Sequence, residues 1–439
     1  GIYYTPADVA SYMTETCVNK LSKKHNSLFC CRFMDFSCGS GIFLLQIIDS
    51  VFQRLKINSF EDYVSYISSS LFGMDISKYA VDCARYTVLS HSIRKFQNQK
   101  VNIKSLLKVL EQNIVSADAT KLLEYFECHP DYPQRFDCII GNPPYVGVIT
   151  ESKNGAQQSS RSNLFIPFVS NLVDYSTDNS ICALVIPLSF SYNNQPSYRD
   201  MRRMIQKDSA EWYIEHYDRS PDSLFGDDVK SRNCIIFRNQ GNTNHKIYVT
   251  GLIRWTSINR SQLWTTTKYM TDITDLTIED YIPKLGTLIE KQAFSAITTN
   301  GDSLLQQLVS KSLEKIFLVV IKGTAYNWIC AYDHIPAGKD KNGNEYVSKD
   351  LKVYSAQTED DAYFVLAVLN STFAFWLWTV IGDGFHVTNR LLSSLCISKI
   401  SFSKHQYSKM VSLGKEFSSK IIQYPSQSVN NGKIITNYD

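Results

Sequence analysis

Short apolar runs bounded by turn-forming residues alternate with longer helical patterns over roughly the first 240 residues. The apolar runs predict strands at residues 30–36, 71–76, 113–118, 136–142, 181–190, 211–218 and 233–239. Between most of them, the pattern predicts helices at residues 41–54, 77–97, 163–176 and 197–207. This alternation is typical of a mostly parallel sheet with helices on both faces. Only residues 219–232 separate the last two strands, so we expect a hairpin and an antiparallel final strand.

The alternation stops after a polar stretch at residues 238–246, which divides the chain into a first domain at 1–242 and a second at 243–439. In the second domain we expect a helix at 303–316 and an apolar helix at 362–382. The apolar stretch is long enough to span a bilayer. Asn370, Ser371 and Thr372 lie at its middle and no basic residues flank it, so a buried helix is favoured and no membrane is expected.

The 439 residues are 44% apolar and 20% charged, which is typical of a globular protein and excludes a disordered chain. The net charge of +3 permits a polyanionic partner without demanding one. The eleven cysteines and eight histidines show no metal-binding spacing, so no metal is expected. No signal-peptide pattern is present, and we expect free thiols and a cytoplasmic location.

Short polar side chains stand at the carboxyl ends of the first four predicted strands: Asp35, Asp75, Asp118 and Asn142. Ligands bind beyond the carboxyl ends of the strands in sheets of this kind. One such residue could be a capping accident, whereas four at successive strand ends predict a site.

A glycine-containing turn, with Ser37, Gly39 and Gly41, follows the first strand and precedes a helix. Glycines there allow close approach of a ligand to the helix N-terminus. Leu44 occupies the place of a third glycine, so a nicotinamide dinucleotide fold loses support. Taken alone, the motif could also be an ordinary tight turn.

Acids after the next two strands could bind an adenosine group. Asp75, followed by Ile76, could accept both hydroxyls of a ribose, and Asp118, followed by Ala119, could accept from an adenine amino group. Either acid alone could equally be a helix N-cap. With the glycine turn, the two outline a pocket for an adenosine-containing cofactor.

Five motifs in order, "YYTP" (3–6), "DFSCGSG" (35–41), "GMDIS" (73–77), "SADAT" (116–120) and "NPPY" (142–145), resemble the S-adenosylmethionine-dependent DNA adenine-N6 methyltransferases. The order is similar to the gamma type, as in TaqI- and Eco57I-like restriction-modification methyltransferases. The resemblance implies a Rossmann-like, seven-stranded α/β catalytic domain at 1–242. It also implies an α+β target-recognition domain at 243–439, S-adenosylmethionine as cofactor, no metal, and double-stranded DNA as partner.

The resemblance also implies roles for individual residues. Asn142 and the carbonyl of Pro143 would accept the two N–H groups of a flipped adenine, with Pro144 restricting the backbone. Tyr145 and Phe225 would contact the base, although Phe225 could instead be a core residue. Leu164 and Phe165 match a segment that lines the pockets, or are helix-core residues. The implied cofactor-binding residues are Tyr3, Thr5, Pro6, Asp35, Ser37, Gly39, Gly41, Asp75, Ile76, Asp118, Ala119 and Asn142.

Several features keep more than one interpretation. The polar stretch 150–163 is a mobile loop near the substrate or a plain linker. Segments 251–262 and 381–392 could touch phosphates or base edges, or could be solvated surface. A nuclease is not evident; one upstream of Gly1 or in a separate subunit stays open, as does action of a monomer on DNA.

Other functions remain open at this point. A protein-glutamine N5 methyltransferase also uses Asn-Pro-Pro-Tyr, but does not usually carry a large domain after its seventh strand. RNA adenine N6 methylation would use the same chemistry. A catalytically inactive DNA-recognition subunit would not need the intact set of motif residues.

Overall fold

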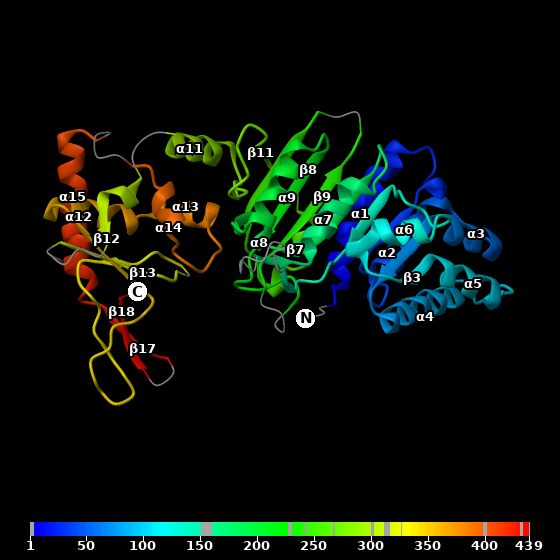
Figure 1. Cartoon of the computed structure of the whole chain (residues 1–439), viewed down its shortest axis with the longest axis horizontal. Coiled ribbons are helices and arrows are strands. Elements are labelled where there is room, and N and C mark those ends of the chain that lie inside the picture. The colour runs from blue at the N-terminus through cyan, green and yellow to red at the C-terminus, as the bar shows by residue number, and fades with distance from the viewer. Residues whose placement is uncertain are drawn as a thin grey trace. The chain divides into compact units, whose positions relative to one another are not determined.

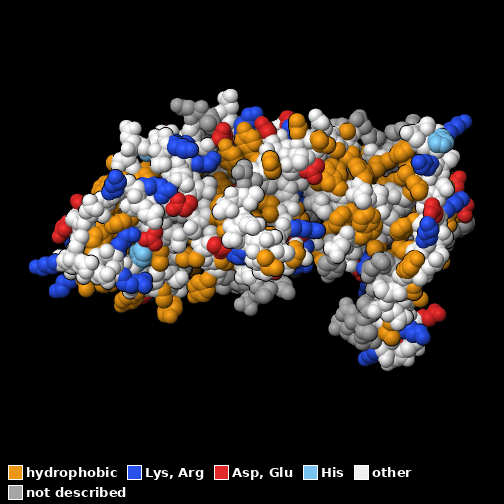
Figure 2. Space-filling view, turned by 180° about the vertical axis from the view of Figure 1, so that it is seen from behind, with side chains coloured by type: hydrophobic (Ala, Val, Ile, Leu, Met, Phe, Trp, Pro, Cys, Tyr) orange, Lys and Arg blue, Asp and Glu red, His pale blue; other side chains and the backbone are white. Residues whose placement is uncertain are grey.

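The computed structural model describes residues 4–150, 160–226, 231–241, 244–266, 268–299, 303–310, 317–325, 327–397, 402–430 and 433–438. The chain forms two compact units, Gly1–Gly286 and Thr287–Asp439. Figure 2 shows acidic and basic side chains interspersed with apolar ones on the face it presents, in keeping with the small net charge.

A nine-stranded sheet crosses the first unit (Figure 1), in the order β11-β10-β8-β9-β7-β4-β1-β2-β3. β9 runs antiparallel to β7 and β8, and β11 antiparallel to β10, whereas the other neighbouring pairs are parallel. The predicted hairpin and antiparallel strand are therefore confirmed. The strands are β1 (Phe33–Asp35), β2 (Leu71–Asp75), β3 (Ile114–Ser116), β4 (Cys138–Gly141), β7 (Ile181–Pro187), β8 (Glu211–Tyr217), β9 (Asn233–Asn239), β10 (Lys246–Ile253) and β11 (Thr271–Asp272).

Helices of the first unit lie at the predicted places, with further helices between them. The α-helices are α1 (Ala7–Lys24), α2 (Ile42–Leu55), α3 (Phe60–Ser70), α4 (Lys78–Lys95), α5 (Ile103–Asn113), α6 (Leu122–Cys128), α7 (Phe165–Asp174), α8 (Ser189–Tyr192), α9 (Pro196–Lys207) and α10 (Gln262–Thr265). Short 3₁₀ helices are η1 (Leu28–Cys30), η2 (Ala119–Lys121) and η3 (Ser257–Asn259). The predicted Rossmann-like α/β fold is confirmed.

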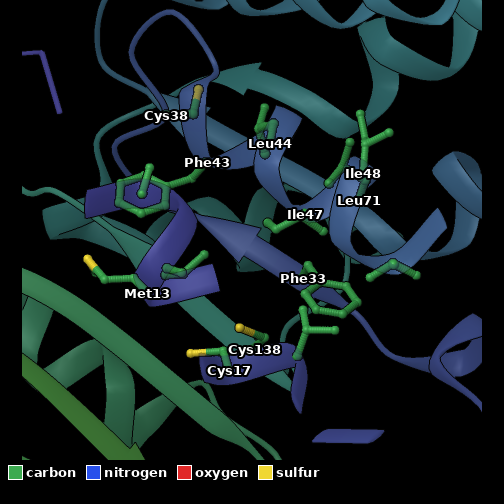
Figure 3. Packing of buried hydrophobic residues seen from close by; sticks show 14 of the residues in the cluster. Met13, Cys17, Phe33, Cys38, Phe43, Leu44, Ile47, Ile48, Leu71 and Cys138 are labelled. Atoms are coloured by element: carbon green, nitrogen blue, oxygen red, sulfur yellow. The ribbon is translucent and has the colours of Figure 1, made fainter. Parts of the chain in front are cut away.

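The core of the first unit lies between the sheet and its helices. Figure 3 shows Met13 and Cys17 of α1 near the strands that carry Phe33 and Cys138, and all four side chains are buried. Burial of such apolar surface contributes about 25 cal/mol per Å². This packing holds β1 and β4, whose carboxyl ends carry predicted site residues, against α1.

The first unit extends beyond the predicted boundary at residue 242. β10 pairs in parallel with β8, from Lys246 opposite Glu211 to Ile253 opposite Tyr217, and β11 adds a further strand. Residues 246–253 therefore belong to the central sheet and not to the second unit. The sheet gains two strands over the expected seven, and the structure divides the chain after Gly286.

The second unit mixes helices with small antiparallel sheets, ordered β12-β16-β13-β14 and β15-β18-β17. Its strands are β12 (Leu308–Ser310), β13 (Leu318–Lys322), β14 (Ala331–Tyr332), β15 (Gly338–Lys339), β16 (Leu351–Ala356), β17 (Pro425–Asn430) and β18 (Lys433–Tyr438). Its helices are α11 (Leu288–Thr299), the 3₁₀ helix η4 (Leu304–Gln307), α12 (Glu359–Leu369), α13 (Thr372–Ile381), α14 (Asn389–Ser394) and α15 (Lys404–Ile421).

The helix predicted at 303–316 is wrong over the part that is described. Ser303 and Gln306 form a capping box around η4, after which β12 pairs with β16 from Leu308 opposite Ala356. A short apolar run fits a strand as well as a helix, and the β16 partner decides between them. Residues 311–316 lie outside the described ranges.

The apolar stretch 362–382 forms two helices that meet at an angle of 59°. At the break, the Asn370 side-chain amide donates to the carbonyls of Leu366 and Ala331, each at 2.9 Å, and its oxygen accepts from the Ala331 N–H at 3.0 Å. The Ser371 side chain caps α13. Within the described ranges, no single helix is long and apolar enough to cross a membrane, although this bent pair passes by length and composition.

Candidate functional site

The carboxyl ends of β1, β2, β3 and β4 lie side by side because these strands are parallel neighbours. The register places Asp35 opposite Gly73 and Asp75 opposite Ser116. Asn142 directly follows β4, and Asp118 lies just beyond β3. The four polar strand ends predicted from the sequence therefore share one edge of the sheet.

Asp35 is the fully buried acid of this edge. Its Oδ1 accepts from the Ser37 N–H at 2.9 Å and from the Ser37 hydroxyl at 3.4 Å. Its Oδ2 is buried and has no hydrogen-bond partner among the described residues. Burial, together with the negative charge of Asp75, raises the pKa of Asp35 to about 8. An unpartnered buried oxygen of this kind is suited to a hydrogen-bond donor of a ligand.

Gly141, the last residue of β4, leaves the space that the Asp35 carboxyl group fills. A Cβ atom at position 141 would lie 2.7 Å from Asp35 Oδ1 and 3.2 Å from the Ser37 hydroxyl. Gly141 is not among the site residues predicted from the sequence. Its signal was a glycine at a strand end directly before Asn142, where a close backbone approach is common.

The glycine turn after β1 is joined to the end of β2. Gly39, at φ +51°, donates its N–H to Asp75 Oδ2 at 3.0 Å, while Asp75 Oδ1 accepts from the Ser77 N–H at 2.9 Å. Gly41, at φ +90°, is the N-cap of α2. Ser77, and not Asp75, caps α4. The Asp75 carboxylate thus fixes the two turns that border the site.

The remaining predicted cofactor residues differ in how they are engaged. Asp118 caps η2, accepting from the Thr120 N–H at 2.9 Å and its hydroxyl at 2.7 Å, so the capping interpretation holds for this acid in the structure. Ala119 is buried, whereas the Ile76 side chain is 74% exposed directly after Asp75. An apolar side chain at that place is available to a flat apolar ligand group.

At the N-terminal end, Thr5 is buried and Pro6 is the N-cap of α1. Tyr3 lies outside the described residues, so its predicted role stays a prediction.

The "NPPY" turn follows β4 with Pro143 buried and Asn142, Pro144 and Tyr145 half-buried. The Tyr145 hydroxyl donates to the Val185 carbonyl of β7 at 2.9 Å, and the Asn233 side-chain amide lies 3.4 Å from the same hydroxyl. Burial of its hydroxyl group raises the pKa of Tyr145 well above its ordinary value. These hydrogen bonds to the hydroxyl group fix the position of the Tyr145 ring.

Phe225 lies against Tyr145, with ring centroids 6.3 Å apart and ring planes at 88°. It is half-buried and also packs against the core of the first unit. The structure thus brings together the two aromatic residues that are predicted to contact the same ligand, although they lie far apart in the chain.

The segment after the turn runs through β5 (Gly147–Thr150) and β6 (Ser160–Asn163), which pair antiparallel. The Leu164 N–H donates to the Val146 carbonyl at 2.9 Å. Phe165 is buried and meets Tyr198 of α9 edge to face, at 5.8 Å, as a core residue does. Residues 151–159 of the predicted loop lie outside the described ranges. In the parts of the chain that are described, no cluster of three or more His, Cys, Asp or Glu could hold a metal ion.

Replacing Asp35 with asparagine is expected to change how stability depends on pH. The pKa of Asp35 is about 8 when folded, against an ordinary value of 3.8, so the folded state binds this proton more tightly. The contribution of this proton to the free energy of unfolding is fully present below about pH 4. It is lost as the pH rises through about 8, at up to roughly 1.4 kcal/mol per pH unit. Denaturant unfolding across this range should show a shallower fall for D35N than for the wild type.

The exposed Asp131 supplies the control for this measurement. D131N should keep the wild-type pH dependence. An identical pH dependence of D35N and the wild type would contradict the raised pKa.

Comparisons with known proteins relate this site to a family. Residues 69–221 match the model of the family described as Eco57I restriction-modification methylase. This region contains β2, the "NPPY" turn and β7. The predicted resemblance to restriction-modification methyltransferases is thereby confirmed for this part of the chain. No curated protein matches the chain.

Among solved structures, the chain is similar to two Type ISP restriction-modification enzymes in complex with DNA or a DNA substrate mimic. LlaBIII matches with a TM-score of 0.55 and 13% identity, covering 98% of this chain and 40% of that one. A nuclease-deletion mutant of LlaGI matches with 0.56 and 13%, covering 98% and 48%. A DrdV–DNA complex matches with 0.51 and 15%, covering 100% and 43%. At these identities the likeness is one of fold, and the chain spans less than half of each of these relatives.

Proposed function

We propose that the chain transfers a methyl group from S-adenosylmethionine to N6 of an adenine flipped out of duplex DNA, as part of a restriction-modification system. The observation that carries this proposal is the "NPPY" turn standing beside the buried Asp35 and the Gly39–Asp75 contact, at one sheet edge. The family match over residues 69–221 supports it. The compact unit Thr287–Asp439 is the proposed target-recognition part.

The residues at the sheet edge fit S-adenosylmethionine. The unpartnered, buried Asp35 Oδ2 would accept from the ammonium group of the cofactor, and the glycine turn would allow its backbone to approach closely. Ile76 would cover one face of the adenine, and Asp75 retains acceptor capacity for ribose hydroxyls. When bound, the cofactor supplies a methyl group on a positively charged sulfur.

The "NPPY" turn would prepare the adenine amino group. The N6 lone pair is delocalised into the purine ring, so the nitrogen is a weak nucleophile. Hydrogen bonds from its two N–H groups to the Asn142 side-chain oxygen and the Pro143 carbonyl would localise the lone pair on nitrogen. Pro143 and Pro144 restrict the backbone and so hold the carbonyl at a fixed angle.

The two aromatic rings would receive the base differently. Because their planes meet at 88°, a flat base can stack face to face on only one of them in this arrangement. Tyr145, held by the Val185 carbonyl and next to Asn142, is the proposed stacking surface, and Phe225 would meet the base at an edge. Base–aromatic stacking contributes about 1–3 kcal/mol, similar to the few kcal/mol that extrusion costs.

Incubation with tritium-labelled S-adenosylmethionine tests this function. We expect label to enter duplex DNA and digested nucleosides to contain N6-methyladenine, while modification-aware sequencing reports the methylated site. Calorimetry with S-adenosylhomocysteine measures cofactor binding separately. Lack of affinity for the cofactor would overturn the enzyme assignment and favour a recognition subunit. Label in RNA or in protein glutamine, but not in DNA, would contradict the assignment of duplex DNA as the substrate.

The partner assignments follow from the same proposal. We infer that the protein acts on DNA as a monomer, which sedimentation with duplex DNA tests. A nuclease upstream or in a separate subunit is tested by cleavage assays.

A further inference from the structure

Segment 254–264, which includes η3 and the start of α10, runs along loop 218–226, the loop that carries Phe225. Three hydrogen bonds join them: Arg254 Nε to Asp218 Oδ2 at 2.9 Å, the Ser257 N–H to Asp222 Oδ2 at 2.5 Å, and Arg260 Nη2 to the Leu224 carbonyl at 2.9 Å. The last of these fixes the peptide next to Phe225. We call segment 254–264 the bracing segment.

The bracing segment also holds the start of α1. Arg260 donates from Nε and Nη2 to the two carboxylate oxygens of Asp8, at 2.7 and 3.0 Å. The Trp264 indole N–H donates to Asp8 Oδ2 at 2.8 Å. Asp8 lies in the first turn of α1, close in the chain to the predicted cofactor residues Thr5 and Pro6. Paired hydrogen bonds of this geometry are strong and directional.

Surrounding contacts fix the bracing segment in place. The Trp264 ring lies 4.9 Å from that of Tyr12 on α1, and the Tyr12 hydroxyl donates to Glu215 of β8 at 2.6 Å. Lys268 pairs with Glu215 at 3.1 Å and stands over the Tyr12 ring. The guanidinium group of Arg260 therefore bonds both to α1 and to the Phe225 loop, and the segment that carries it is itself packed against α1.

We propose that Arg260 is a positioning residue that couples cofactor binding to base extrusion. The inference rests on the proposed function, in which Phe225 meets the base, and on the cofactor-binding role that the sequence resemblance implies for Thr5 and Pro6. A cofactor seated against the start of α1 would restrain Asp8, and Arg260 would carry this restraint to the Leu224 carbonyl, which holds Phe225 beside Tyr145. Coupling between two ligands is reciprocal, so an extruded base should also tighten cofactor binding by the same factor.

The coupling can be measured with S-adenosylhomocysteine and a duplex that carries 2-aminopurine at the methylated position. Calorimetry gives the Kd of S-adenosylhomocysteine with and without the duplex, and 2-aminopurine fluorescence reports extrusion. We expect the duplex to tighten cofactor binding in the wild type by about 5- to 150-fold, the usual range for such coupling. In R260M this factor should fall close to one, with less cofactor-induced fluorescence.

Arg54 provides a matched control. Arg54 lies on α2 and pairs at 2.7 Å with Glu15, which lies on α1 as Asp8 does. The Arg54 and Glu15 side chains are 26% and 40% exposed, and those of Arg260 and Asp8 are 26% and 33% exposed. R54M therefore removes a similar ion pair that does not touch the Phe225 loop, and it should keep wild-type coupling. D8N, which removes the negative charge and one of the two acceptor oxygens of this link from the α1 side, tests the coupling if R260M is less stable than R54M.

The outcomes separate the inference from the proposed function. An active wild type without coupling, wild-type coupling in both R260M and D8N, or equal loss of coupling in R54M would each overturn the role of Arg260 while methylation stands. A wild type that neither binds the cofactor nor methylates DNA would overturn the proposed function, and this inference with it.

Discussion

Asn142→Ala is expected to reduce methyl transfer by at least about 100-fold while leaving cofactor affinity largely unchanged. The alanine removes the side-chain oxygen that would accept from the adenine amino group, and loss of one such preorganised hydrogen bond typically costs about 100- to 1,000-fold in rate. The Pro143 carbonyl remains but cannot hold both N–H groups. Single-turnover tritium transfer to duplex DNA measures the rate, and calorimetry with S-adenosylhomocysteine measures cofactor affinity.

Asn102→Ala is the matched control for this variant. Asn102 is exposed and caps α5, a helix that carries none of the predicted site residues, and its loss should cost about 1 kcal/mol of stability without lowering the rate. Near-wild-type incorporation of tritium by N142A would show that Asn142 does not prepare the nucleophile. Loss of cofactor affinity equal to the loss in rate would assign Asn142 to cofactor binding instead.

Gly141→Ala is expected to weaken cofactor binding by at least about tenfold and to destabilise the first unit by about 1–3 kcal/mol. The added methyl group would lie 2.7 Å from Asp35 Oδ1, so the carboxyl group or the strand must shift. Asp35 is fully buried and is bonded to the Ser37 N–H, which leaves little room for movement. Calorimetry and thermal unfolding measure the two effects.

Gly251→Ala controls for the exchange of glycine for alanine in the same sheet. Gly251 lies on β10, and a Cβ atom there would meet Gly286 at 3.4 Å, an ordinary contact distance. G251A should therefore bind the cofactor as the wild type does. Wild-type cofactor affinity in G141A would mean that the Asp35 carboxyl group does not face the ligand.

The local parts of the fold and site were predictable from the sequence. At each of these strand ends, the apolar strand, the polar residue and the following helix are consecutive in the sequence. The signal for the strand end is therefore contained in one short stretch of chain. This local order is enough to place Asp35, Asp75 and Asn142 at one edge of the sheet, where the strand order also puts them. The separation of residues 303–310 into η4 and β12 was not predictable, because it depends on pairing with β16.

Contacts between distant residues were the part that the sequence could not supply. Arg254 and Arg260 stand in a segment that also suited phosphate contacts, and only the fold shows them paired with Asp218 and Asp8. Likewise, β10 joined the central sheet through its pairing with β8, which moved the division of the chain to Gly286. No local pattern encodes these partners.

The buried cysteines make the two units distinguishable by thiol chemistry. Cys330 is the buried thiol of the second unit, whereas the first unit contains buried Cys17, Cys31, Cys38, Cys138, Cys182 and Cys234. A thiol reacts as its thiolate, so these groups are protected until the surrounding structure opens. Mass-spectrometric mapping of alkylation along a denaturant titration would therefore record the unfolding of each unit separately, using only the cysteines of the chain itself.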